Sequence, residues 1–184
     1  MVFGIYLRAF RTEDALFINA LRRIEAMENK IGGVKRFVSP ERELKWVQDI
    51  IQGDNPSAVY LAICENGNDG IIGYTSIADI DYRNGSCFWS GIKLAPEKSG
   101  KGYGLQTALM ILKYVFEELR MVRCIGHALE EHGVAIKLME KAGFRKEGLM
   151  RNYVYKNGEH KNTWLLSILQ EEYIQVKQRY ELEP

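Results

Sequence analysis

The sequence has no apolar run of the roughly 18–20 residues that a membrane-spanning helix needs. Its three cysteines, Cys64, Cys87 and Cys124, form no closely spaced pair, which argues against a disulfide framework and against a cysteine-based zinc site. The first residues show no secretory signal pattern, and no repeat or low-complexity tract is present. We therefore expect a soluble, cytoplasmic protein without a metal site, whose cysteines are small core residues.

A strong net charge is also missing. The sequence has 25 Lys and Arg residues and 24 Asp and Glu residues, so that its formal net charge is +1. Such a chain has no global field that attracts nucleic acids or anionic membranes, and we expect neither as a partner. With 184 residues, 46% of them hydrophobic and 27% charged, the composition is that of a globular protein. The length predicts one domain over residues 1–184.

Hydrophobic periodicity and turn signals predict an alternation of strands and helices. Strands are expected at residues 5–10, 58–64, 70–80, 86–94, 122–128, 144–155 and 160–169. Helices are expected at residues 13–24, 39–52, 105–119, 133–142 and, in the carboxy-terminal tail 171–184, at 171–180. This order predicts an α+β fold on a central mixed sheet, with one parallel crossover around the third helix.

Local signals place the helix ends. Thr12 is the expected cap of the first helix, and Ser39 followed by Pro40 is a typical start for the second. The second helix is expected to bury Leu44, Val47, Ile50 and Ile51. The tail helix carries an apolar stripe that fits either a homodimer contact or packing on its own chain, made of Tyr173, Ile174, Val176 and Tyr180.

A glycine-rich turn, residues 99–104, leads into the helix that the sequence predicts most strongly, with its apolar residues on one face. Glycines let successive backbone N–H groups converge, and a helix start adds unpaired donors, so the turn suits a phosphate or pyrophosphate. A tight turn that needs glycine only for its geometry is the alternative. Ala95 and Gly102 break the P-loop pattern, and Leu105 and Thr107 break the dinucleotide-binding pattern.

In this context the chain resembles the GNAT superfamily of acyl-CoA-dependent N-acyltransferases. The family's pyrophosphate motif, Arg or Gln-x-x-Gly-x-Gly or Ala, falls on Ser99-x-x-Gly102-x-Gly104. Residues 94–97, 138–144 and 145–169 also look like family segments, so that the resemblance covers about residues 5–170. It is nearest to the branch of ribosomal-protein N-terminal and spermidine acetyltransferases. It implies a mostly antiparallel sheet of about seven strands with about four flanking helices.

The resemblance also implies which residues bind acetyl-CoA. The strand before the glycine turn would splay from its neighbour, so that pantetheine pairs with Ile92, Lys93 and Leu94. The pyrophosphate site would comprise Ser99, Gly100, Lys101, Gly102, Tyr103, Gly104 and Leu105. A backbone N–H of the splayed strand would polarise the thioester carbonyl, and an amine would attack it directly.

Three positions depart from the family pattern. Ser99 replaces the usual Arg or Gln, which weakens one contact to the pyrophosphate but leaves the backbone site intact. His132 stands where an asparagine commonly contacts the cofactor, and an exposed histidine at a helix start is the alternative. Met139 stands where many members have a tyrosine that protonates the leaving thiolate, and we interpret it as a core side chain. A thiol pKa near 8.5 makes this loss tolerable.

The catalytic base is harder to identify. Asp79 and Asp81 share one face at the end of a strand and are the predicted catalytic pair, although a solvated turn fits them too. Glu25 and Glu28, in the region that lines the acceptor side in the family, are alternatives. The predicted acceptor-binding residues are Glu28, Tyr155 and Trp89, for which a place in the core is the alternative. A proton donor in place of Met139 would come from Tyr103, Tyr153 or Tyr155.

The sequence thus predicts an N-acetyltransferase that uses acetyl-CoA as co-substrate and acts on a primary amine. The acceptor is a small molecule or a protein N-terminus. A module that binds CoA without catalysis is the alternative, given Ser99 and Met139. An ordinary nucleotide-binding domain is a third interpretation, which the broken phosphate motifs disfavour.

Overall fold

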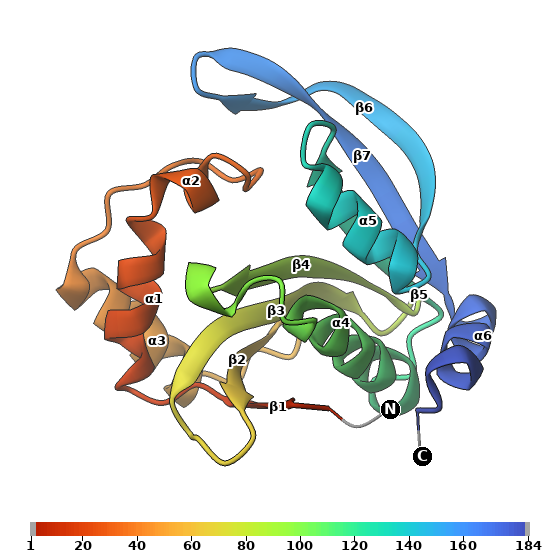
Figure 1. Ribbon diagram of the computed structural model, residues 1–184, viewed down its shortest axis with the longest axis horizontal. Coiled ribbons are helices and arrows are strands. Elements are labelled where there is room, and N and C mark those ends of the chain that lie inside the picture. The colour runs from red at the N-terminus through yellow and green to blue at the C-terminus, as the bar shows by residue number, and fades with distance from the viewer. Residues whose placement is uncertain (1–2, 183–184) are drawn as a thin grey trace.

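The computed structural model describes residues 3–182, which form one seven-stranded sheet in the order β1-β2-β3-β4-β5-β7-β6 (Figure 1). The strand bounds are β1 Ile5–Ala9, β2 Val59–Glu65, β3 Ile71–Asp81, β4 Ser86–Leu94, β5 Arg123–Leu129, β6 Arg145–Lys156 and β7 Glu159–Leu169. Only β4 and β5 pair in parallel, and the other neighbours are antiparallel. The predicted α+β fold and its one parallel crossover are confirmed.

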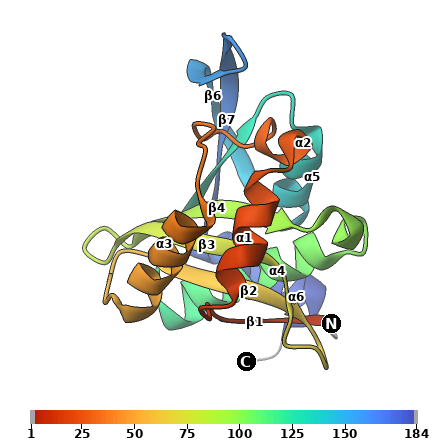
Figure 2. The same ribbon diagram turned by 90° about the vertical axis from the view of Figure 1, so that its left-hand side faces the viewer.

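Helices cover both faces of this sheet. Their bounds are α1 Asp14–Arg22, α2 Glu25–Glu28, α3 Pro40–Gln52, α4 Tyr103–Lys113, α5 Gly133–Lys141 and α6 Gln170–Tyr180, and a π-helical turn, Tyr114–Glu118, extends α4. Figure 2 shows α1 and α3 lying over one face of the sheet. Residues of α4, α5 and α6 join the core on the other face. In the described range no helix is long and apolar enough to cross a membrane.

The two predicted helix starts had different outcomes. Ser39 caps α3 as expected, because its hydroxyl accepts the N–H of Arg42 at 3.2 Å. The prediction for Thr12 was wrong: Glu13 occupies the cap position of α1, and no side chain caps it. Only the backbone carbonyl of Thr12 takes part, accepting the N–H of Ala15 at 3.3 Å.

The buried face of α3 differs from the predicted one. Val47 is fully buried and Ile50 packs against the core, as predicted, but Leu44 and Ile51 are 37% and 44% exposed. The helix instead buries the carboxylate of Glu43, which accepts the Nε–H of Arg22 at 2.6 Å. Satisfying this buried charge fixes the rotation of the helix and turns Leu44 and Ile51 outward, because an unpaired buried carboxylate is very costly.

The tail packs on its own chain. Tyr173 and Val176 of α6 are buried, and the Tyr173 ring stacks on Phe116 at 5.1 Å. Ile174 points away from this contact and is 54% exposed. Of the two alternatives for the stripe, the structure shows intramolecular packing for Tyr173 and Val176, while a homodimer contact through Ile174 stays a prediction.

The cysteines lie in the core, as predicted. All three are buried and free. Cys87 and Cys124 are nevertheless register partners on β4 and β5, although their spacing in the sequence gives no sign of it. Among the described residues, no cluster of three His, Cys, Asp or Glu side chains could hold a metal ion.

Candidate active site

The two parallel strands separate in the middle of the sheet. Their register pairs run from Ser86–Arg123 to Trp89–Gly126 and end there. Beyond this point β5 continues to pair with β7 on its other side, whereas no partner of β4 on the β5 side is found within the described chain. Residues 90–94 therefore present an open backbone edge, on which an extended ligand can form strand-like hydrogen bonds.

A β-bulge lies at the start of this open edge. The register between β3 and β4 shifts between the pairs Ile77–Trp89 and Thr75–Ile92, so that Ser90 and Gly91 together face one residue. Gly91 has a φ of +81°, in the left-handed region that glycine adopts without strain. A β-bulge bends the strand that contains it, and this bulge lies directly after Trp89, the last residue of β4 that pairs with β5.

The glycine turn after β4 adopts an open, left-handed backbone. Gly100 and Gly102 have φ angles of +78° and +81°, and a Cβ at Gly100 would meet nothing within 4 Å. Gly102 caps α4, and its carbonyl accepts the Gln106 N–H at 3.2 Å. The N–H groups before Gln106 lie in the first turn, where an α-helix supplies no partners of its own. The geometry suits an anion at the start of α4.

Glu65, the last residue of β2, connects this turn to the sheet. Its carboxylate accepts a hydrogen bond from Lys98 Nζ at 2.5 Å and another from the Tyr103 hydroxyl at 2.9 Å. These hydrogen bonds lower the pKa of Glu65 and raise that of Tyr103. Lys98 lies directly before the glycine turn and Tyr103 lies near its end, so Glu65 connects the two ends of the turn.

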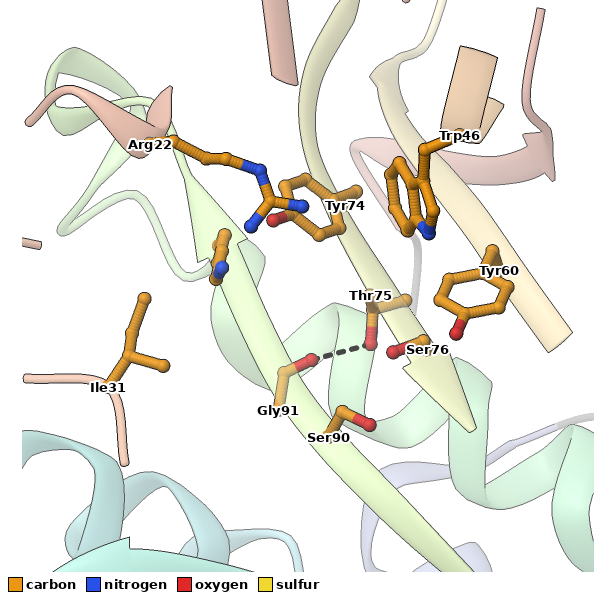
Figure 3. A pocket seen from close by; sticks show the side chains of 10 residues that line it. Arg22, Ile31, Trp46, Tyr60, Tyr74, Thr75, Ser76, Ser90 and Gly91 are labelled. Carbon is orange, nitrogen blue, oxygen red and sulfur yellow. Dashed lines mark hydrogen bonds between the residues drawn. The ribbon is translucent and has the colours of Figure 1, made fainter. Parts of the chain in front are cut away.

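A cavity of about 230 Å³ opens on the other side of β4 (Figure 3). It is lined by Arg22, Ile31, Trp46, Tyr60, Tyr74, Thr75, Ser76, Ser90, Gly91 and Lys93. Figure 3 shows Trp46 and Tyr60 on one side of it and Ile31 on the other, and the Arg22 guanidinium lies 5.5 Å from the centre of the Trp46 ring. Because Ser90 and Gly91 also begin the open edge of β4, the cavity and that edge meet at the bulge.

Two cations line the cavity, and each has a carboxylate partner outside the lining. Burial acts to lower the pKa of Arg22, but its contact with Glu43 at 2.6 Å, together with the charges of Tyr74 and Glu28, outweighs this effect and raises the pKa. Lys93 Nζ lies 3.9 Å from Glu28 Oε1 and 5.3 Å from the centre of the Tyr74 ring. Burial, together with the charge of Arg22, lowers the pKa of Lys93.

The predicted cofactor residues lie on β4 and around the start of α4. Alternation along β4 directs Ile92 and Leu94 toward the α4 side, where both pack in the core, whereas Lys93 lines the cavity on the opposite face. Ser99, Gly100, Lys101 and Gly102 are exposed or nearly so, and Tyr103, Gly104 and Leu105 are half-buried at the helix start. His132 caps α5 by position only, without a side-chain hydrogen bond, and its pKa is lowered by burial and by the charge of Lys30.

The predicted acceptor residues do not gather in one place. Trp89 is only 2% exposed and packs on Phe144, which favours its place in the core. Glu28 does not line the cavity, but its carboxylate lies 3.9 Å from Lys93, which does. Among the described residues, no donor forms a hydrogen bond with Oε1 of Glu28. Tyr155 is 62% exposed on the β6–β7 hairpin, in contact with His160, and does not line the cavity.

The predicted catalytic pair lies at the far end of β3. Asp81 accepts hydrogen bonds from the backbone N–H groups of Arg83 and Asn84 and from the Asn84 side chain, which lower its pKa. Asp79 is exposed at a φ of +49°. Neither residue lines the cavity, and the geometry of Asp81 is that of a turn. Met139 is buried in the core, as interpreted from the sequence.

Sequence reasoning missed most of the cavity. Arg22 was assigned only to a helix, and Trp46, Tyr60 and Tyr74 were given no role. The four residues come from α1, α3, β2 and β3, and no spacing in the sequence connects them. The one local signal was Lys93, a charged residue between apolar neighbours in a strand.

Comparison with known proteins is consistent with this geometry. An N-acetyltransferase of the SPbeta prophage of Bacillus subtilis is 25% identical over 175 residues, which are 92% of each chain. The spermidine N(1)-acetyltransferase of Vibrio cholerae is 29% identical over 112 residues, covering 61% of this chain and 64% of the relative. A structure of the Vibrio cholerae spermidine N-acetyltransferase with CoA and spermine has the same fold, with a TM-score of 0.85 at 23% identity over 93% and 98% of the two chains.

The sequence also matches the family model of the acetyltransferase (GNAT) domain over residues 5–145, which is most of the chain. This match agrees with the splayed strands, the glycine turn and the cavity at the bulge. The protein is a member of the GNAT acetyltransferase family, which uses acetyl-CoA as the acetyl donor.

Proposed function

We propose that this protein transfers an acetyl group from acetyl-CoA to a primary amine by direct attack, with both substrates bound at the β4 bulge. One observation carries this proposal: the cavity and the open edge of β4 share Ser90, Gly91 and Lys93. A thioester placed along the edge would thus lie within reach of an amine placed in the cavity. Holding two reactants together in this way can remove a large part of the barrier to such a reaction.

Acetyl-CoA would lie across the splayed part of the sheet. Pantetheine would pair with the backbone of Ile92, Lys93 and Leu94, and the pyrophosphate would accept N–H groups of residues 100–105. Support comes from the open backbone at Gly100 and from the start of α4. Because these donors are backbone groups, Ser99 in place of a long cationic side chain does not remove the site.

Direct attack is favoured because no cysteine is available as a nucleophile. Cys64, Cys87 and Cys124 are all buried, and burial raises the pKa of Cys64. The pKa of Cys124 is also raised, through its contact with Cys87 and its burial. A buried, protonated thiol is a poor nucleophile, so an acyl-enzyme intermediate has no cysteine to form on.

Proton transfer makes modest demands on the protein. The CoA thiolate is a fair leaving group, since a thiol has a reference pKa near 8.5. Tyr103, one of the possible donors from the sequence, uses its hydroxyl to bind Glu65. The assignment of Asp79 and Asp81 as the catalytic pair stays a prediction, and its test is the amine-dependent rate of the D79N and D81N variants. We also propose that the protein is located in the cytoplasm.

The test uses the full chain, acetyl-CoA and a panel of primary amines, with release of the CoA thiol as the readout. Binding of acetyl-CoA is measured separately by calorimetry. Amine-dependent CoA release supports the proposal. Stoichiometric binding without turnover on any amine would favour the alternative of an inactive CoA-binding module. A failure to bind acetyl-CoA at millimolar concentration would rule out both.

A further inference from the structure

The acceptor cavity is lined by cations but not by carboxylates. Arg22 and Lys93 both line it, and the other lining residues are aromatic, apolar, hydroxyl-bearing or glycine. Their partners Glu43 and Glu28 do not contribute to the lining. A ligand that enters the cavity therefore contacts the two cations directly, while the carboxylates of Glu43 and Glu28 lie behind them, 2.6 Å from Arg22 and 3.9 Å from Lys93.

Both cations keep donors available to a ligand. Arg22 donates its Nε–H to Glu43, and the two outer nitrogens of the guanidinium group take no part in that hydrogen bond. Figure 3 shows this guanidinium next to Tyr74, at the cavity. Lys93 is 3.9 Å from Glu28, which is longer than a hydrogen bond. Two partly exposed cations with donors to spare form a site for an anionic group.

The size of the cavity and its aromatic wall restrict the rest of the ligand. A volume of about 230 Å³ is below the range of about 300–1,000 Å³ that is usual for drug-sized ligands, so the part of the ligand that the cavity encloses is small. Trp46 and Tyr60 form an aromatic wall, with ring centres 5.5 Å apart in an edge-to-face contact, and the Arg22 guanidinium lies 5.5 Å from the centre of the Trp46 ring. Such a wall favours an apolar or aromatic group.

The same lining disfavours a polyamine. Amines of this kind are protonated at neutral pH, since their pKa is close to the value of about 10.4 for a lysine side chain. Each further ammonium group in the cavity would face Arg22 and Lys93 without a carboxylate in the lining to compensate it. The direct contacts of such an ammonium group would thus be with like charges, which repel at short range.

We propose that the acceptor is a compact primary amine that also carries a carboxylate, of the size and chemistry of an aromatic amino acid. Arg22 and Lys93 bind the carboxylate, Trp46 and Tyr60 contact the apolar group, and the amine faces the bulge at Gly91. This inference rests on the proposed function, because it names the substrate class of the same site.

The test compares amines that differ only in the carboxylate: tryptophan with tryptamine and tyrosine with tyramine, with spermidine as a third class. The expected kcat/KM is about 10- to 100-fold higher for the acid of each pair, as a charged hydrogen bond provides. In K93M this preference is lost, and in K93R it is restored. The control K45M, at an exposed lysine on α3, retains it.

Three results would overturn the inference while acetyl-CoA binding stays intact. These are equal or faster turnover of the amines that lack a carboxylate, a preference for spermidine, and no turnover of any of the acids. Loss of acetyl-CoA binding by the unmodified protein would instead contradict the proposed function itself. Calorimetry on the unmodified protein separates the two cases, because acetyl-CoA binds in the first case and does not bind in the second.

Discussion

The indole N–H of Trp89 donates a hydrogen bond to the Thr75 hydroxyl at 2.9 Å, and both side chains are buried. The same hydroxyl donates to the carbonyl of Gly91 at 2.8 Å. A short chain of hydrogen bonds thus links a core tryptophan to the bulge at which β4 leaves β5. The position of the open strand edge is set by buried side chains of the core.

Replacing Thr75 with valine keeps the volume but removes both hydrogen bonds and leaves the Trp89 N–H unpaired. We expect T75V to lower the free energy of unfolding by about 1–3 kcal/mol in a urea titration. We also expect kcat to fall, because the bulge loses its support. Thr163 offers a matched control, since it is also buried and its hydroxyl has no partner among the described residues. If T163V proves as damaging as T75V, the hydrogen bonds are not the cause.

The second prediction concerns the backbone conformation at Gly102 and its effect on acetyl-CoA binding. A φ of +81° is strained for any residue with a Cβ, so G102A should shift the turn and raise KM for acetyl-CoA. The control is G148A on β6, because a Cβ at Gly148 would meet nothing within 4 Å and the φ of this residue is not positive. Steady-state kinetics and calorimetry check the difference, and equal KM values for the two variants would contradict it.

Glu65 provides a third prediction, which concerns the positioning of the glycine turn. In E65A both Lys98 and Tyr103 lose their partner, and KM for acetyl-CoA should rise several-fold while kcat changes little. The variant Y103F removes only one of the two contacts, and its effect should be smaller. A decrease in kcat at unchanged KM would show instead that Glu65 acts on the chemical step.

The fourth prediction concerns pH and α6. Burial opposes ionisation of Glu117, but hydrogen bonds from Lys177, Tyr173 and Lys113 outweigh it and lower its pKa from 4.5 to about 2. Because the folded pKa lies below the unfolded one, this stabilisation is present above pH 4.5 and is lost as the pH falls toward 2.

Such a shift corresponds to at most about 3 kcal/mol, and we expect about 1 kcal/mol because the carboxylate is partly solvated. Urea titrations from pH 7 to about pH 3 should therefore show a smaller loss of stability for E117Q than for the unmodified chain. The neighbouring exposed residue gives the control E118Q, which should follow the unmodified chain. Parallel pH profiles for all three proteins would contradict this role of Glu117.

Local sequence determined a large part of this protein. The turn at Asn157-Gly158, the Ser39 cap and the glycine turn before α4 depend on backbone preferences and contacts within a few residues, and all are present in the structure. For the same reason the order of strands and helices along the chain, and with it the fold class, follows from periodicity. The pyrophosphate site could be proposed from the sequence because it is built from one continuous segment.

Only the tertiary structure decided the cavity beside β4 and the rotation of α3. The cavity brings together Arg22, Trp46, Tyr60 and Lys93 from four elements, and packing rather than spacing makes them neighbours. Glu43 turns α3 because it must reach Arg22 on a different helix. Backbone preferences act over a few residues, whereas the partner of a buried charge depends on which distant segments pack beside it.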